Sequence, residues 1–130
     1  MKPEAALYRW FKDHCHGAWH RIENAISSGM PDVAVLYEGK TQWIELKVGE
    51  TALLRPAQHV WQMNAELQGV KTLVILQHTN NGSLFFYRRP FHCNFDGKYW
   101  EIAGFAPTLW CPRTIANAPK IHDVLFSSSP

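Results

Sequence analysis

Two apolar, β-rich runs separated by Glu38-Gly39 constrain the fold of this chain more than any other feature. The first run is Val33–Tyr37 and the second is Thr41–Val48. A two-residue turn centred on Glu38-Gly39 would join them as an antiparallel hairpin in which residue numbers summing to 77 face each other. That register sets Asp32 opposite Glu45, with Cβ atoms about 4.5–5.5 Å apart. A three-residue loop would instead leave the two carboxylates as diagonal neighbours.

The charged residues of this hairpin suit a divalent metal ion. Glu45 and Lys47 lie on one side of their strand because side chains alternate along a strand. With Asp32 opposite Glu45, two carboxylates and an ammonium group are predicted to meet on one face. Carboxylate oxygens are hard ligands for such an ion, and a lysine beside it can act on the ion's bound water. The competing interpretation is a surface ladder of solvated charges.

Length and composition place the chain among ordinary globular proteins. It has 130 residues, of which 46% are hydrophobic and 18% charged, which predicts one domain, residues 1–130, with its own core. A net charge of +2 allows a polyanionic partner without implying one. No apolar run approaches ~18 residues, and the N-terminus has no signal-peptide pattern. Three cysteines without paired spacing indicate a reducing compartment, so we expect the cytoplasm of a bacterium or phage-infected host.

Further elements flank the hairpin in a recognisable order. Helices are predicted at Pro3–His14 and Pro56–Gln68, where proline suits the first turn and glycine follows the end. Strands are predicted at Trp19–Asn24, Lys71–Gln77 and Leu84–Arg88. The order is therefore α-β-β-β-α-β-β, in which the second helix can return a parallel strand to the sheet.

The region after Pro90 is rich in prolines and aromatic residues. It predicts a short strand at Tyr99–Ile102 and a short helix at Ile121–Phe126, within either a cover over the sheet or a partner surface. Four of the six tryptophans are predicted core residues, and the other two lie in this loop-rich region: Trp10, Trp19, Trp43 and Trp61, then Trp100 and Trp110.

The segment His14-Cys15-His16, with His20 nearby, invites a zinc interpretation. No second ligand pair with matching spacing follows it, and histidine is favoured at helix ends in any case. The sequence therefore does not favour a zinc site.

Pro31-Asp32, followed after twelve residues by Glu45-Leu46-Lys47, resembles the signature of the PD-(D/E)XK nuclease superfamily. Leu54–Gln58 further resembles the R-P-x-Q segment of small VRR-NUC-type nucleases, many of them phage-encoded. The resemblance covers roughly residues 4–78. It implies an α/β (α+β) fold, with a mixed central β-sheet flanked by helices. This restriction-endonuclease-like αβββαβ core would span about residues 4–89, with 90–130 as a C-terminal extension.

The resemblance also implies an activity, that of an endodeoxyribonuclease dependent on Mg²⁺ or Mn²⁺. Asp32 and Glu45 would be metal ligands, with the main-chain carbonyl of Leu46 as a third. Lys47, its pKa lowered beside the cation, would orient or deprotonate the attacking water or stabilise the transition state. Gln58 would help to position the metal waters or the phosphate.

The sequence does not decide which residues complete the site. A further acid often completes such sites, and Glu4 on the first helix and Glu23 on the first strand have about equal claims. Arg55, Arg21 and Arg88 are candidate phosphate contacts.

By analogy with the family, the substrate would be branched or nicked DNA, and a homodimer is possible. Two alternatives keep the same fold. One is a catalytically inactive nucleic-acid-binding protein, and the other is a protein-interaction module.

Overall fold

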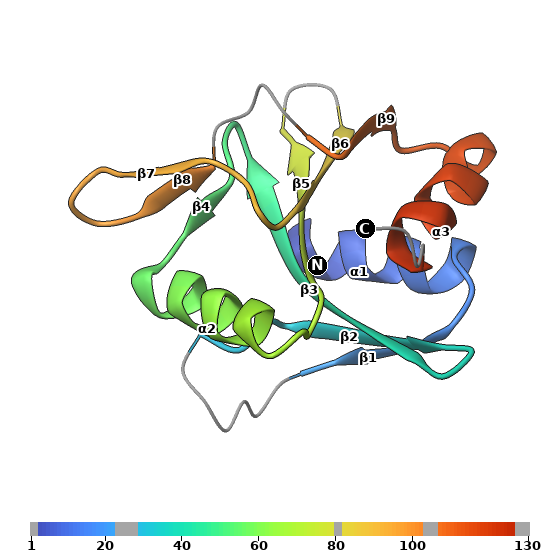
Figure 1. Cartoon of the computed structure of the whole chain (residues 1–130). Coiled ribbons are helices and arrows are strands. Elements are labelled where there is room, and N and C mark those ends of the chain that lie inside the picture. Colours follow the sequence, from blue (N-terminus) through green and yellow to red (C-terminus); the bar gives the residue numbers. More distant parts are fainter. Residues whose placement is uncertain (1–2, 23–28, 80–81, 103–106, 127–130) are drawn as a thin grey trace.

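The computed structural model describes residues 3–22, 29–79, 82–102 and 107–126. Three α-helices, one 3-10 helix and nine strands occur in this part of the chain (Figure 1). In chain order they are α1 (Pro3–His14), β1 (Ala18–Arg21), β2 (Val33–Tyr37), β3 (Lys40–Gly49), β4 (Leu53–Leu54), α2 (Pro56–Leu67), β5 (Thr72–His78), β6 (Ser83–Arg88), β7 (Cys93–Phe95), β8 (Trp100–Ile102), β9 (Leu109–Pro112), the 3-10 helix Ile115–Asn117 and α3 (Ala118–Phe126).

The main sheet has six strands in the order β1-β2-β3-β5-β6-β9. Strands β3 and β5 are parallel, and α2 lies between them in the chain. The other neighbouring pairs are antiparallel. A parallel pair needs a long crossover, which the helix supplies. The mixed sheet flanked by helices confirms the fold predicted from the sequence.

The β2–β3 hairpin has the predicted register. Val33 faces Ile44 and Tyr37 faces Lys40, so paired residue numbers sum to 77. Both turn residues have positive φ, 48° at Glu38 and 77° at Gly39, as two-residue hairpin turns with left-handed centres require. Asp32 directly precedes β2 and its carbonyl oxygen accepts a hydrogen bond from the amide of Ile22, 2.7 Å away.

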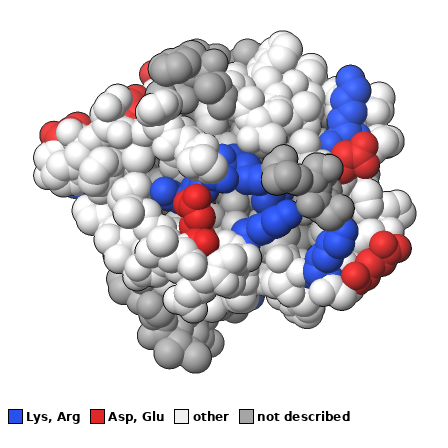
Figure 2. All heavy atoms as spheres, viewed as in Figure 1, with Lys and Arg blue, Asp and Glu red and all other residues white. Residues whose placement is uncertain are grey.

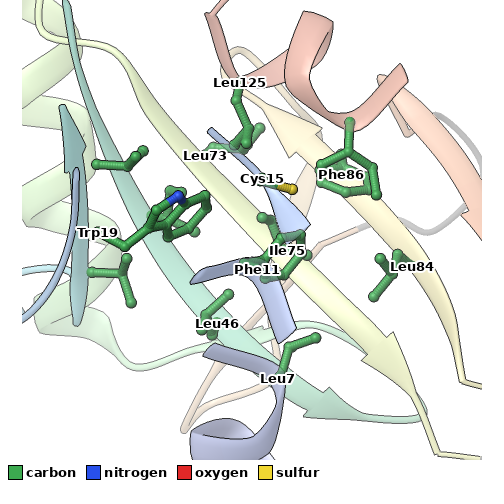
Figure 3. Packing of buried hydrophobic residues seen from close by; sticks show 14 of the residues in the cluster. Leu7, Phe11, Cys15, Trp19, Leu46, Leu73, Ile75, Leu84, Phe86 and Leu125 are labelled. Carbon is green, nitrogen blue, oxygen red and sulfur yellow. The ribbon is translucent and has the colours of Figure 1, made fainter. Parts of the chain in front are cut away.

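Helices α1 and α3 cover one face of the main sheet (Figure 1). The apolar residues of α1 that point inward, Leu7 and Phe11, are fully buried against alternate residues of the strands. Figure 3 shows Phe11, Trp19 and Phe86 within this cluster, and the rings of Phe11 and Trp19 stack with centroids 5.6 Å apart. Trp19 is thus a core residue, as predicted. Trp10 packs partly buried against the cluster.

The opposite face carries α2 and a second, three-stranded sheet in the order β4-β8-β7. Ala52, Leu54 and Ile102 bury a smaller core there against Val74 and Leu76 of β5. Half-buried Trp43 and Trp61 contact each other on this side, at 5.7 Å between ring centroids. They are therefore packed side chains without being fully buried.

The region after Pro90 contributes more regular structure than the sequence predicts. Strand β9 extends the main sheet beside β6, and β7 pairs with β8. Helix α3 begins at Ala118, three residues before the predicted start. Most of this region is a cover over both faces of the sheet. Trp100 packs against the smaller core, whereas Trp110 on the edge strand is 54% exposed.

All three cysteines are free thiols, which agrees with their spacing in the sequence. None of the helices in the described residues is long and apolar enough to cross a membrane.

Candidate active site

The hairpin and the start of α2 bring four polar residues together on one face of the main sheet. Asp32 directly precedes β2, Glu45 and Lys47 lie in β3, and Gln58 lies in the first turn of α2. Glu45 and Gln58 are buried, at 4% and 5% exposure. Alternation along β3 sends Ile44 and Leu46 to the α1 face and leaves Glu45 and Lys47 on the α2 face.

Gln58 is the hydrogen-bonding centre of this group. Its Oε1 accepts from Lys47 Nζ at 3.0 Å and from the main-chain amide of Arg55 at 2.8 Å. Its Nε2 donates to Glu45 Oε1 at 2.9 Å. The bond to Arg55 satisfies an amide at the start of the helix, where no intrahelical acceptor exists. One amide side chain therefore fixes the end of α2, the lysine and one carboxylate relative to one another.

Gly29 positions Asp32 by allowing a close approach of main chains. It has φ of +82°, and a Cβ atom there would overlap the carbonyl group of Ala57 in α2. Only glycine fits such a position without displacement. The segment leading to Asp32 is thereby held against the first turn of α2. Asp32 Oδ1 then accepts a hydrogen bond from the amide of Leu46, at 3.2 Å.

The electrostatics of the group are those of charges held together out of water. Burial, and then repulsion from Asp32, raise the pKa of Glu45 to about 8. Burial also raises the pKa of Asp32, against the opposing effect of the Leu46 amide. Burial lowers the pKa of Lys47, although both carboxylates favour its charged form. A buried and a half-buried carboxylate that repel each other are a site at which a cation is favourable.

The donor set fits a hard divalent cation. Asp32 and Glu45 also hydrogen-bond to each other through their side chains, so their carboxyl oxygens lie close enough together to bind one ion. Among the described residues, no three His, Cys, Asp or Glu side chains are grouped as a metal site. Two carboxylates with main-chain oxygen and waters are the arrangement that Mg²⁺ accepts. The His14–His16 segment likewise belongs to no group of three such side chains among the described residues, and the His16 ring packs against that of His122.

The remaining predicted site residues differ in how close they lie to this group. Glu4, half-buried at the start of α1, is close enough for its charge to favour protonated Lys47. Glu23 lies outside the described residues. Arg55 is exposed at the start of α2, and its charge acts on both Glu45 and Lys47. Arg21 is exposed beside α1, with its guanidinium 5.9 Å from the Tyr8 ring centroid.

Arg88 is not brought to this group. It ends β6, and its Nη2 donates to the carbonyl oxygen of Val124 near the end of α3, at 2.6 Å. Cations are favourable at that end of a helix, which gives Arg88 a structural role there. Figure 2 shows lysine and arginine side chains gathered near the middle of the face that it draws. Arg88, Arg89 and Lys71 line a hollow between the end of α2 and the end of β6.

The main-chain contact of Gly29 and the stacking of His59 on Trp100 are features that sequence reasoning missed. The two rings lie 4.3 Å apart with 23° between their planes, one residue beyond Gln58. Neither feature leaves a local signal, because each joins segments that are distant in the chain.

No protein-family model and no curated protein sequence matches this chain. Its structure is similar to that of Hjc, a Holliday junction resolvase from the archaeal hyperthermophile Archaeoglobus fulgidus. The TM-score is 0.56 at 16% sequence identity, and the match covers 90% of this chain and 97% of the resolvase chain. The chain therefore has a restriction-endonuclease-like fold.

Proposed function

We propose that this chain is a metal-dependent endodeoxyribonuclease that uses Mg²⁺ or Mn²⁺. The observation that carries the proposal is the group of Asp32, Glu45, Lys47 and Gln58 on one sheet face. Within it, Gln58 hydrogen-bonds to Glu45 at 2.9 Å and to Lys47 at 3.0 Å. The resemblance of its sequence to the PD-(D/E)XK signature and the likeness of the fold to a junction resolvase support the same activity.

Each residue has a role that follows from its surroundings. Asp32 and Glu45 would hold the ion, with the carbonyl of Leu46 as a third ligand and Glu4 as the further acid. The ion, when bound, would supply charge neutralisation at the phosphoryl group and a more acidic water. Lys47 would take the proton from the attacking water, because burial lowers the pKa of its ammonium group. Gln58 is a positioning residue, since it orients both Lys47 and Glu45.

The activity is tested with purified protein, plasmid DNA and synthetic four-way junctions, with Mg²⁺, Mn²⁺ or EDTA. We expect cleavage with either metal ion and none with EDTA. Asp32→Ala and Lys47→Ala should each reduce cleavage at least about a hundredfold. Glu50→Ala and Lys12→Ala are the matched controls, because both side chains are exposed. Wild-type protein that cleaves nothing, or variants as active as the controls, would contradict the proposal. Salt-sensitive DNA binding without cleavage would indicate an inactive binding protein.

A second variant distinguishes between Lys47 as a proton acceptor and Lys47 as a positive charge only. Arginine keeps the positive charge but does not lose its proton at accessible pH. If Lys47 accepts a proton, Lys47→Arg should be nearly as inactive as Lys47→Ala. If it acts only through its charge, Lys47→Arg should keep most of the activity, measured as cleavage rate across pH 6 to ~9.

We also propose that the enzyme is selective for branched DNA and acts as a homodimer. The solved structure of similar fold is a Holliday junction resolvase, and two sites at a fixed separation would give selectivity by shape. Val60, Met63 and Leu67 form an exposed apolar stripe along α2, and Val70 lies exposed beyond its end. Such a stripe suits a second copy packing across a two-fold axis.

The assembly is tested by sedimentation velocity. Leu67→Glu should convert a dimer into a monomer, because it places charge in the centre of an apolar interface. Ile115→Glu is the control, since Ile115 is also largely exposed but lies in the 3-10 helix. A wild-type chain that is monomeric at every concentration would contradict the dimer and leave the nuclease proposal intact.

A further inference from the structure

The hairpin formed by β7 and β8 projects from the body of the molecule beside α2 (Figure 1). It lies outside the main sheet, in the second sheet, where β8 pairs with β4. Leu54 of β4 faces Trp100, and the next residue, Arg55, begins the turn that Gln58 caps. The hairpin therefore pairs with the strand that leads directly into the first turn of α2, where Gln58 lies.

A row of three rings runs outward from the first turn of α2. His59 follows Gln58, and its ring stacks on Trp100 at 4.3 Å. Trp100 in turn contacts Phe95, with centroids 5.2 Å apart and 40° between the planes. Exposure increases along the row, because His59 is buried, Trp100 is half-buried and Phe95 is 50% exposed.

The row is held rigidly at both ends. At the inner end Arg89 Nη2 donates to His59 Nδ1 at 2.8 Å, so that nitrogen is the acceptor and the ring is neutral. At the outer end Asp96 Oδ1 accepts from the amides of Lys98 and Tyr99, at 2.8 and 2.7 Å. An exposed aromatic ring on a preorganised support loses little conformational freedom when it binds a partner.

The two faces of the hairpin differ. Phe95 and Trp100 form a directly opposed pair, and alternation turns Asn94 and Glu101 to the other side. The acidic side chain of Glu101 is thus kept away from the ring of Phe95. Lys98 lies at the tip, with its Nζ 5.2 Å from the centroid of the Tyr99 ring. The tip thus carries one acidic and one basic side chain, Asp96 and Lys98, beside the exposed ring of Phe95. Exposed aromatic rings are the side chains on which proteins stack nucleic-acid bases.

We infer that the β7–β8 hairpin binds an unstacked DNA base on Phe95, next to the site at which the backbone is cut. This inference rests on the proposed nuclease function and adds to it a cause of selectivity. A continuous duplex hides the faces of its bases in the stack, whereas a branch point, gap or nick exposes them. Phe95 would thus favour branched and interrupted DNA over intact duplex.

The test compares Phe95→Ala with Trp110→Ala, a matched control at similar exposure on the distant edge strand β9. Binding is measured in EDTA, so that no DNA is cut, on a four-way junction, a duplex with a one-nucleotide gap and an intact duplex. Phe95→Ala should weaken binding to the first two by about tenfold or more and change binding to intact duplex by less than about twofold. Phe95→Trp should retain the wild-type preference, and Trp110→Ala should change nothing.

A second readout follows the base itself. 2-Aminopurine placed opposite the gap should lose fluorescence on binding the wild type and keep it with Phe95→Ala. Equal weakening on all three DNAs, or no weakening on any, would overturn the inference. Thermal unfolding by circular dichroism checks that the variant is folded. A wild type that cuts DNA while Phe95→Ala keeps its preference refutes the hairpin's role alone, whereas a wild type that cuts nothing refutes the nuclease.

Discussion

The folded structure opposes ionisation of the Glu45 carboxyl group. Burial and the neighbouring Asp32 raise its pKa from 4.5 to about 8. The fold thus favours the protonated form. Its contribution to stability is complete below pH 4.5 and is lost as the pH rises through about 8. Removing this charge with Glu45→Gln should therefore stabilise the metal-free protein at alkaline pH while abolishing cleavage.

The magnitude follows from the same shift. One pKa unit corresponds to about 1.36 kcal/mol. With values of 4.5 in the unfolded chain and about 8 in the fold, ionisation costs about 1 kcal/mol at pH 5 and about 4 kcal/mol at pH 8. Relaxation and water entry reduce such costs in proteins. We expect Glu45→Gln to raise the free energy of unfolding by about 2 kcal/mol or more at pH 8, and by under about 1 kcal/mol at pH 5.

The assay is urea unfolding in EDTA at the two pH values, followed by circular dichroism and fitted with a common m-value. Exposed Glu50→Gln is the control and should change the free energy of unfolding at neither pH. Adding Mg²⁺ or Mn²⁺ should stabilise the wild type at pH 8 and have little effect on Glu45→Gln, because binding to the folded state raises stability. A variant that is no more stable than the wild type at pH 8 would refute the conclusion that Glu45 is a buried carboxylate repelled by Asp32.

Two further substitutions test how the site is built. Gly29→Ala should lower the free energy of unfolding by about 2 kcal/mol or more, because the new Cβ overlaps the main chain of α2. Gly69→Ala is the control, as its positive φ is alike but nothing lies within 4 Å of the added atom, and similar losses would contradict the close approach. Gln58→Leu should reduce cleavage at saturating metal more than about tenfold, since Lys47 and Glu45 lose their common partner. Gln68→Leu, exposed just past the end of the same helix, should cleave normally, and equal rates for the two variants would count against the positioning role.

The parts of this fold that could be predicted are those whose signals are local. The Glu38-Gly39 turn and the alternation of β2 and β3 were enough to determine which residues of the hairpin face each other. Proline and glycine marked the ends of α2 in the same way. The region after Pro90 was predicted less well. Its short strands are stabilised by pairing with distant segments, as β9 pairs with β6 and β8 with β4. Such pairing depends on burial across the whole domain rather than on local propensity.

The sequence by itself predicted that Asp32, Glu45 and Lys47 meet on one face of a hairpin, because side chains alternate along a strand and a short turn joins the two strands. The structure decided between a two-residue and a three-residue turn. Only the tertiary structure decided what surrounds them. The packing of α2 across the sheet delivers Gln58 to Lys47 and Glu45, and the close approach of Gly29 to Ala57 fixes the loop that carries Asp32. The tertiary structure also places Arg88 against α3 and brings the β7–β8 hairpin, through Trp100, against His59 of α2. The physical reason is that these contacts join segments far apart in the chain, and their geometry is set by how helices and sheets bury their apolar faces together.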